Sequence, residues 1–487
     1  MSFLLTIAGH DPVNGAGITA DLATWGAMGL RGASVVTALT VQNSRGLEQV
    51  LPIDARVVRD ALQAVLHDGE PAVIKVGLLG SVAVAHEVAG FLAARSCPVV
   101  VDPILSASNG HATHADTESD FITALAAVMV RADVITPNRP EAERLLGAPV
   151  TDALVSAKAL RARCRGAVVL KGGHDAGSRC FDWVCDAQRS AVLGAERLPA
   201  ASHGTGCVFS AALAGMLAQG WDCFEAAAEA RVRAQAGIAQ AWAIGPGRPN
   251  THASPAISSA HLPTWQWLDR SADLAPESLR FAAPIGPLGF YPVVASAEWV
   301  ERLLSWGVRT IQLRIKQGAM PADELHAQLA AAVAASNAVP DSQLFINDHW
   351  REALALGVYG VHLGQEDLDT ADLNALRNAG LRLGVSSHTP LEMARAHAVQ
   401  PSYVALGPVY ETTLKAMRYM PLGLPRLREW TRRYRPRYPV VAIGGITLAH
   451  APAVWDCGVE SIAVVGAVTQ AADPREATRA FMSQMTR

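Results

Sequence analysis

Long apolar runs are missing from the sequence. No stretch of about 18 uninterrupted apolar residues occurs, so no segment is expected to span a bilayer. Residues 1–10 carry no basic segment and only a short apolar run, which fits a first strand better than a signal peptide. We therefore expect a cytoplasmic protein with no membrane partner.

Cysteine pairs and an excess of charge are also missing. The seven cysteines are scattered and contain no Cys-x-x-Cys pair, which argues against a disulfide framework and a zinc site. The net charge of −3 gives the chain no electrostatic reason to bind nucleic acid or an anionic membrane. Small molecules are the expected partners, and a homo-oligomer is left open.

The sequence lacks the P-loop pattern G-x-x-x-x-G-K-[ST], which argues against a P-loop nucleotide enzyme. Residues 15–20 do fit G-x-G-x-x-A after an expected strand. However, no acidic residue closes the next strand, where a dinucleotide ribose would need one. We interpret these glycines as a turn that approaches a small substrate closely.

The length and the distribution of proline indicate two domains. A chain of 487 residues exceeds one ordinary domain, and prolines are dense between Gly245 and Pro287. Such density interrupts both helices and strands, so we expect a domain over 1–245, a linker over 246–287 and a domain over 288–487.

The apolar pattern predicts an α/β class for both domains. In the first, short apolar runs alternate with alanine-rich helical stretches, which indicates a doubly wound parallel sheet covered on both faces. Its expected strands are 3–9, 34–42, 72–77, 99–102, 134–136 and 168–171. In the second, eight strand–helix units predict a TIM (β/α)8 barrel. Its expected strands are 291–294, 310–314, 344–347, 360–363, 383–386, 403–406, 440–443 and 461–464.

An anion site is indicated in the first domain by His203-Gly204-Thr205-Gly206-Cys207, which precedes an apolar helical stretch. Free backbone N–H groups and the helix dipole stabilise an anion there, and the same field would favour the thiolate of Cys207. The alternative is a glycine-rich turn into a core helix, with Cys207 as a small buried hydrophobe.

Two further segments follow expected strands of this domain. Asn138 and Glu141 suit magnesium and its water shell, whereas Lys171 suits the phosphates of ATP. Because the carboxyl ends of parallel strands open onto one crevice, these groups are expected near one another.

With these motifs assembled, the first domain resembles the hydroxymethylpyrimidine/phosphomethylpyrimidine kinases of the ribokinase-like superfamily. The resemblance covers about 3–243 and rests on ordered motifs at 6–12, 15–18, 20–22, 37–43, 75–77, 101–103, 136–138, 171–174 and 203–207. It implies phosphorylation of hydroxymethylpyrimidine or its phosphate by ATP, and the following roles are implied as well. Gln42 and the region of Asp21 would hold the aminopyrimidine. Glu141 would order Mg2+, and Lys171 would contact ATP. The amides of Gly204 to Gly206 would stabilise the transferring phosphoryl group, and Cys207 would stand in place of an aspartate base.

The first domain also departs from the kinase pattern. His10 replaces the usual Ser or Thr, Val13-Asn14 replaces Ser-Gly, and the segment 199–202 is altered. These changes touch the substrate loop and the approach to the anion site. A kinase for another vitamer, such as a pyridoxine-like compound, therefore stays open.

Polar residues follow the strands of the second domain. Alternation places Gln312, Arg314 and Lys316 on one face of a strand end, so that a donor and two cations converge. Asp348 and Asp367 arrive from the next two strands and suit a magnesium ion shared with a pyrophosphate.

This pattern, over 291–481, resembles thiamine-phosphate synthase. The resemblance implies that pyrophosphate leaves a pyrimidine carbocation, which the nitrogen of thiazole phosphate captures. Its implied residues are Gln312, Arg314, Lys316, Asn347 and Lys415 for the pyrimidine pyrophosphate, Asp348 and Asp367 for Mg2+, Ser386 for the leaving group, Thr412 for the thiazole, and Gly445, Val465 and Gly466 for the thiazole phosphate. The hydroxyl that the family carries at the position of Leu414 is absent here, and Gly466 stands where a serine is common in the family.

The leading hypothesis is a bifunctional transferase of thiamine biosynthesis, whose first half makes the pyrimidine pyrophosphate that the second consumes. The alternative from another class is that one half has degenerated to a ligand-binding module.

Overall fold

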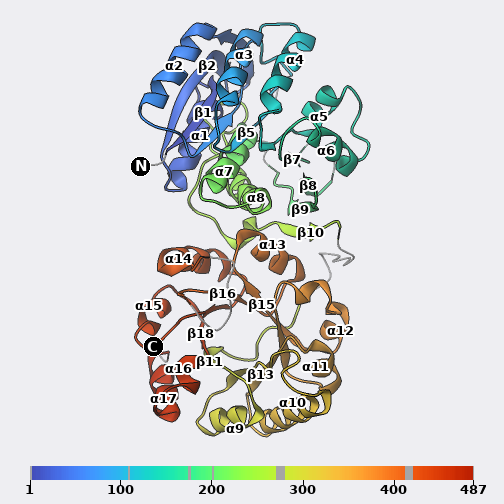
Figure 1. Ribbon diagram of the computed structural model, residues 1–487, viewed down its shortest axis with the longest axis vertical. Coiled ribbons are helices and arrows are strands. Elements are labelled where there is room, and N and C mark those ends of the chain that lie inside the picture. The colour runs from blue at the N-terminus through green and yellow to red at the C-terminus, as the bar shows by residue number, and fades with distance from the viewer. Residues whose placement is uncertain are drawn as a thin grey trace. The chain divides into compact units, whose positions relative to one another are not determined.

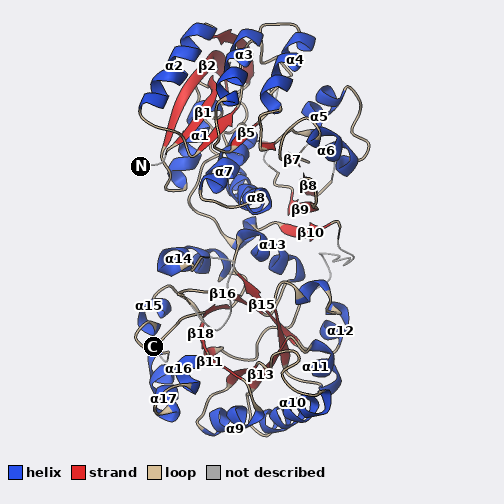
Figure 2. Ribbon diagram, viewed as in Figure 1, coloured by secondary structure: helices blue, strands red, loops and turns tan. Residues whose placement is uncertain are grey.

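The chain divides into two compact units, Met1–Asp269 and Arg270–Arg487. The structure is a computed structural model that describes residues 3–107, 110–173, 177–199, 202–269, 280–411 and 420–485. Figure 1 shows the order of the elements, and Figure 2 shows the strands of each unit with helices on their outer sides.

The N-terminal unit is built on one ten-stranded mixed sheet in the order β10-β9-β8-β7-β6-β5-β4-β1-β2-β3. Its strands are β1 (Leu4–His10), β2 (Gly32–Asn43), β3 (Gly46–Pro52), β4 (Val73–Val76), β5 (Val99–Val101), β6 (Val134–Ile135), β7 (Ala167–Leu170), β8 (Arg179–Cys185), β9 (Ser190–Glu196) and β10 (Thr264–Trp267). The strands from β2 through β1 and β4 to β7 are parallel, whereas β3, β8, β9 and β10 pair antiparallel.

Helices cover both faces of this sheet. They are α1 (Gly17–Ala27), α2 (Ala55–His67), α3 (Val82–Ala93), α4 (Glu118–Met129), α5 (Arg139–Leu146), α6 (Ala153–Arg161), α7 (Thr205–Ala218) and α8 (Cys223–Ala239). Helices α2, α3 and α4 form one layer, and α1, α7 and α8 form the other (Figure 1). Strands β4 to β7 are buried along their whole length because both of their faces lie under helices.

The six strands expected from the sequence are confirmed and pair in parallel, and the sheet contains four further strands that were not predicted. The four missed strands pair antiparallel near the two edges, and β3 mixes apolar with polar residues instead of forming a continuous apolar run. Part of the expected linker, 246–287, belongs to this sheet. Strand β10 lies within that range, pairs with β9 and buries Trp265 completely.

The C-terminal unit contains a closed barrel of eight parallel strands, as expected. They are β11 (Gly289–Val294), β12 (Thr310–Leu313), β13 (Gln343–Asn347), β14 (Gly360–Leu363), β15 (Arg382–Ser387), β16 (Tyr403–Leu406), β17 (Val440–Ile443) and β18 (Ser461–Val464). The surrounding helices are α9 (Ala297–Ser305), α10 (Ala322–Asn337), α11 (Trp350–Leu356), α12 (Leu373–Asn378), α13 (Pro390–Val399), α14 (Gly423–Tyr434), α15 (Ala451–Trp455), α16 (Gly466–Thr469) and α17 (Pro474–Gln484).

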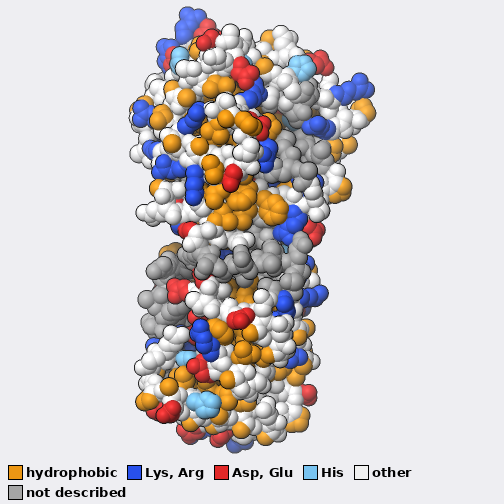
Figure 3. Space-filling view, turned by 90° about the vertical axis from the view of Figure 1, so that its right-hand side faces the viewer, with side chains coloured by type: hydrophobic (Ala, Val, Ile, Leu, Met, Phe, Trp, Pro, Cys, Tyr) orange, Lys and Arg blue, Asp and Glu red, His pale blue; other side chains and the backbone are white. Residues whose placement is uncertain are grey.

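Charge is dispersed over the surface. On the face shown in Figure 3, basic and acidic side chains are scattered over each unit, in keeping with the net charge of −3. In the described part of the chain, no helix combines the length and the apolar character that crossing a membrane requires.

Candidate active sites

The first site forms where helix α7 begins. Gly204 is the N-cap of this helix with a φ of +82°, and a Cβ atom there would lie 1.6 Å from the carbonyl oxygen of Gly15. Only glycine permits this backbone-to-backbone approach. The first turn of α7 has neither a side-chain cap nor an acidic residue, so its positive end is available for an anion.

Lys171 lies beside the same helix turn. A Cβ atom on Gly206 would be 3.3 Å from the Lys171 Nζ and 3.6 Å from Asp102 Oδ2. Lys171 Nζ donates to Asp102 Oδ1 at 2.8 Å, and Thr136 Oγ1 donates to the same oxygen at 2.9 Å. Burial alone would lower the pKa of Lys171, but the carboxylates of Asp102 and Glu141 outweigh burial and raise it. A permanent cation therefore adjoins the open end of the helix.

Glu141 and Asn138 cap helix α5. The Asn138 side chain accepts from the backbone N–H of Glu141 at 2.9 Å, and the Glu141 carboxylate accepts from that of Asn138 at 2.8 Å. Burial, reinforced by Asp102, raises the pKa of Glu141 to about 7. A capping box alone explains why Asn and Glu occur at these two positions. The sequence interpretation did not use this pattern.

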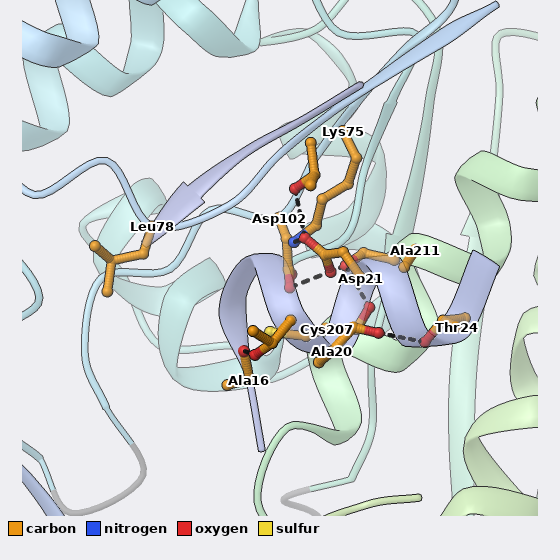
Figure 4. A network of polar contacts seen from close by, with 12 residues as sticks. Ala16, Ala20, Asp21, Thr24, Lys75, Leu78, Asp102, Cys207 and Ala211 are labelled. Atoms are coloured by element: carbon orange, nitrogen blue, oxygen red, sulfur yellow. Dashed lines mark hydrogen bonds and ion pairs between the residues drawn. The ribbon is translucent and has the colours of Figure 1, made fainter. Parts of the chain in front are cut away.

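Cys207 does not have the expected thiolate. Burial raises the pKa of its thiol to about 11, because the nearby Lys75 lowers it by less than burial raises it. Figure 4 shows the thiol close to the pair of Lys75 and Asp21. The electric field at the helix terminus does not overcome desolvation at a position that is only 5% exposed.

Asp21 is fully buried, and its Oδ2 accepts from Lys75 Nζ at 2.9 Å and from Thr6 Oγ1 at 2.6 Å. The carboxylate therefore holds Lys75 in place through a buried ion pair.

Gln42, which is expected to bind the substrate, contacts His203 in the glycine-rich turn before α7. Its amide lies 2.7 Å from His203 Nε2, and the same nitrogen lies 3.0 Å from Asp11 Oδ2. Asp11 also accepts from the backbone of Val13 and Gly15; although burial raises its pKa, these hydrogen bonds and His203 lower it overall. The Gln42 atom that faces His203 is the amide nitrogen Nε2, and Asp11 can only accept. With the proton on His203 Nε2, exchanging the amide oxygen and nitrogen of Gln42 turns this contact between two donors into a hydrogen bond. Roles for Asp11 and His203 were missed by the sequence interpretation.

The second site lies at the carboxyl ends of the barrel strands. Asp348 and Asp367 line a pocket of about 290 Å3 with Gln317, Gly318, His349, Trp350, Arg351, Glu352 and Thr370. Burial and the Asp367 carboxylate raise the pKa of Asp348 to about 6, while Arg314 lowers it. Asp348 also has a positive φ of +63°, an uncommon conformation for a residue other than glycine. Two carboxylates that repel one another in a polar pocket fit a divalent cation.

The other residues expected in the barrel follow their strands. Gln312 is buried within β12, Asn347 ends β13, and Arg314 and Lys316 come after the end of β12, where Lys316 is exposed. Val465 is the N-cap of α16, which begins at Gly466.

Gly445 has a φ of +66° and approaches the carbonyl oxygen of Glu411, so that a Cβ atom would lie 2.4 Å away. Thr412 and Lys415 lie outside the described residues.

Ser386 lies on β15 and is half-buried, and its Oγ lies 2.8 Å from His362 Nε2. His362 was not singled out from the sequence, because one histidine in an apolar strand carries no motif.

Comparison with known proteins assigns both units. Residues 11–252 match the family model for phosphomethylpyrimidine kinase, and residues 291–468 match that for thiamine monophosphate synthase. The thiamine-phosphate synthase of Salmonella paratyphi A is 55% identical over 196 residues, which are 40% of this chain and 91% of the relative. The chain belongs to these two families. It is a bifunctional transferase of thiamine biosynthesis, with a kinase unit and a synthase unit.

Further relatives agree with each unit. The synthase unit matches the thiamine-phosphate synthase of Neisseria meningitidis serogroup A, with 53% identity over 197 residues, 40% of this chain and 94% of the relative. The fold of the kinase unit is shared with pyridoxal kinase from Staphylococcus aureus, solved in complex with ADP, at a TM-score of 0.50 and 24% identity. That match covers 55% of this chain and 99% of the other.

Proposed function

We propose that the kinase unit transfers the terminal phosphoryl group of ATP to hydroxymethylpyrimidine and to its monophosphate. The proximity of Gly206 and Lys171 supports this most directly, because a cation and open backbone N–H groups face the same small space. Charge on a transferring phosphoryl group is stabilised by such donors when they are held in place before the reaction.

In this proposal Gln42 recognises the substrate. In the amide orientation that places the oxygen against a protonated His203 Nε2, the NH2 group of Gln42 is left to donate to a ring nitrogen of the aminopyrimidine. A shift of His203 would move both Gln42 and the loop that leads into α7, so substrate recognition and the phosphate site are mechanically connected.

Cys207 has a limited role as a base here. A thiol with a pKa of about 11 is protonated at neutral pH, so it hydrogen-bonds to the substrate hydroxyl before any proton moves. The buried ion pair of Lys75 and Asp21 lies near that thiol and affects its pKa electrostatically. Glu141 and Asn138 would bear on a magnesium ion only through water, because both are engaged in capping α5.

For the synthase unit we propose the coupling of the pyrimidine pyrophosphate with thiazole phosphate. The carboxylates of Asp348 and Asp367 would hold Mg2+, which supplies positive charge to the departing pyrophosphate. Arg314 and Lys316 add cations on the same rim, Asn347 and Gln312 orient the pyrimidine, and Ser386 donates to the leaving group.

The acceptor side of the reaction is proposed from the loops after the last strands. Backbone N–H groups at Gly445, Val465 and Gly466 would bind the thiazole phosphate, Thr412 would line the thiazole, and Lys415 would contact the pyrimidine pyrophosphate. Because a side chain at Gly445 would collide with Glu411, this part of the rim is shaped by backbone rather than by side chains.

The test uses the full chain with hydroxymethylpyrimidine, ATP, Mg2+ and thiazole phosphate, and measures thiamine phosphate. Formation of product that stops in both Lys171→Met and Asp348→Ala supports the proposal. Adding synthetic pyrimidine pyrophosphate must restore product in Lys171→Met but not in Asp348→Ala. Turnover of ATP on pyridoxine in preference to hydroxymethylpyrimidine would overturn the kinase substrate.

A further inference from the structure

Ser386 is the outer end of a chain of polar side chains inside the barrel. Its Oγ contacts Nε2 of His362 at 2.8 Å, and Nδ1 of His362 contacts Tyr403 Oη at 2.7 Å. Tyr403 Oη lies 2.7 Å from Tyr291 Oη, which Gln312 Nε2 approaches at 3.4 Å. The five side chains come from β15, β14, β16, β11 and β12, so only the closed barrel brings them together.

The barrel interior makes room for this chain and excludes water from it. Tyr291, Tyr403 and His362 are 1%, 0% and 6% exposed. A Cβ atom on Gly384 would lie 2.1 Å from the Tyr403 ring, so the glycine of β15 provides the space that the ring occupies. Buried polar groups in such a setting depend on hydrogen bonds to one another.

The groups of the chain keep fixed protonation states. Burial, with smaller contributions from Arg314 and His388, lowers the pKa of His362 to about 3. Burial raises the pKa of both Tyr291 and Tyr403. At neutral pH the imidazole therefore has a single N–H, and each phenol keeps one proton to donate.

Either phenol of the Tyr291–Tyr403 pair can donate, and one assignment uses each donor of the chain once. In it the amide nitrogen of Gln312 donates to Tyr291, and Tyr291 donates to Tyr403. Tyr403 then donates to His362 Nδ1, which leaves the imidazole proton on Nε2, where it is donated to Ser386. In this assignment the proton of the Ser386 hydroxyl is not used within the chain and is left to donate to a substrate.

We propose that His362, Tyr403 and Tyr291 are positioning residues that hold Ser386 as a hydrogen-bond donor to the leaving pyrophosphate, an inference that rests on the proposed synthase function. The bond between the pyrimidine methylene carbon and the pyrophosphate oxygen breaks with both electrons on oxygen. Ser386 retains its proton and stabilises that oxygen by donating to it. If the direction of the hydrogen bonds were reversed, Ser386 would donate its proton to His362. Its oxygen would then present only lone pairs to the pyrophosphate anion.

The kinetic test is Tyr403→Phe in the full chain, with synthetic pyrimidine pyrophosphate, thiazole phosphate and Mg2+. We expect kcat to fall about tenfold with an unchanged KM for the pyrophosphate, because the loss of about 1.4 kcal/mol is confined to the transition state. Tyr359→Phe is the matched control. Its hydroxyl donates to Gln343 outside the chain at 2.8 Å, and kcat should not change.

A double-mutant cycle separates positioning from a general loss of structure. In the Ser386→Ala background, Tyr403→Phe should cause no further decrease, because the donor that it orients is already absent. His362→Gln, which can still donate to Ser386, should retain more activity than His362→Leu. Independent, multiplicative losses of kcat in the cycle would overturn the proposal.

A measurement without substrate distinguishes this inference from the synthase assignment. Nitrogen-15 NMR of the full chain, with the resonance assigned through His362→Gln, should show a neutral imidazole protonated at Nε2. Protonation at Nδ1 would overturn the proposed direction even in an active enzyme. An inactive wild-type protein with Nε2 protonated would instead count against the synthase function.

Discussion

Gly206→Ala separates the catalytic role of the α7 terminus from its structural role. Gly206 lies in the first turn of α7 and does not have a positive φ, so the backbone tolerates alanine. Alanine is favoured over glycine in a helix by up to about 1 kcal/mol, and stability should be unchanged or higher. The added methyl group would lie 3.3 Å from Lys171 Nζ, in the space assigned to the phosphoryl group.

The expected effect on the kinase is large. Removal of one preorganised donor to a developing oxyanion costs on the order of 100-fold or more in kcat, about 2.7–4 kcal/mol. A methyl group in this space displaces the anion from both the helix N–H groups and Lys171. We therefore expect ATP-dependent phosphorylation of hydroxymethylpyrimidine to fall by at least about 100-fold, measured by coupled ADP release.

Two controls are available within the same chain. Gly26→Ala places a methyl group on an exposed part of α1 with no atom within 4 Å, and should leave kinase activity unchanged. The synthase reaction, supplied with pyrimidine pyrophosphate, should be normal in both variants. Near wild-type kinase activity in Gly206→Ala, with correct folding shown by circular dichroism, would refute the assignment of this space to the phosphoryl group.

Three further predictions concern the thiol of Cys207, the carboxyl group of Glu141 and the repulsion between Asp348 and Asp367. Because the Cys207 pKa is about 11, kinase kcat in the wild type should rise as pH increases from 7 to 9, and Cys207→Ser should lose this rise; a flat wild-type profile would exclude the thiol as the base. The raised pKa of Glu141, about 7 against 4.5, stabilises the folded state below pH 4.5, and this contribution is lost as pH rises to 7. Glu141→Gln should thus gain stability over the wild type between pH 5 and 8, by on the order of 3 kcal/mol in urea unfolding, and a constant difference would contradict it. Asp348→Asn removes the repulsion with Asp367, so it should raise the thermal unfolding midpoint without Mg2+ while abolishing synthase turnover; retained Mg2+-dependent turnover would contradict the metal role.

Much of the fold could be predicted because the signal is local. The apolar runs at β4 to β7 and the eight strand–helix repeats of the barrel are consecutive in sequence, and burial on both faces requires such runs. The antiparallel strands β3, β8, β9 and β10 were missed because their residues alternate or are interrupted. The partners of these strands are set by the tertiary structure, and the local sequence pattern does not specify them.

The candidate sites divide in the same way. Motifs alone located the α7 turn, Lys171, and the carboxylates at Asp348 and Asp367, since glycine spacing and strand ends are visible in the sequence. They left two interpretations of Cys207 open, a thiolate favoured by the helix dipole and a small buried hydrophobe, and the structure buries the thiol and raises its pKa.

The sequence by itself determined the two α/β units, their families and the strand ends on which the reactive groups lie. Only the tertiary structure decided which protons those groups carry and where they point. Asp11, His203 and Gln42 meet across 192 and 161 positions of sequence, and His362 meets Ser386 and Tyr403 only when the barrel closes. Desolvation and hydrogen-bond direction depend on neighbours in space, so no sequence motif contains them.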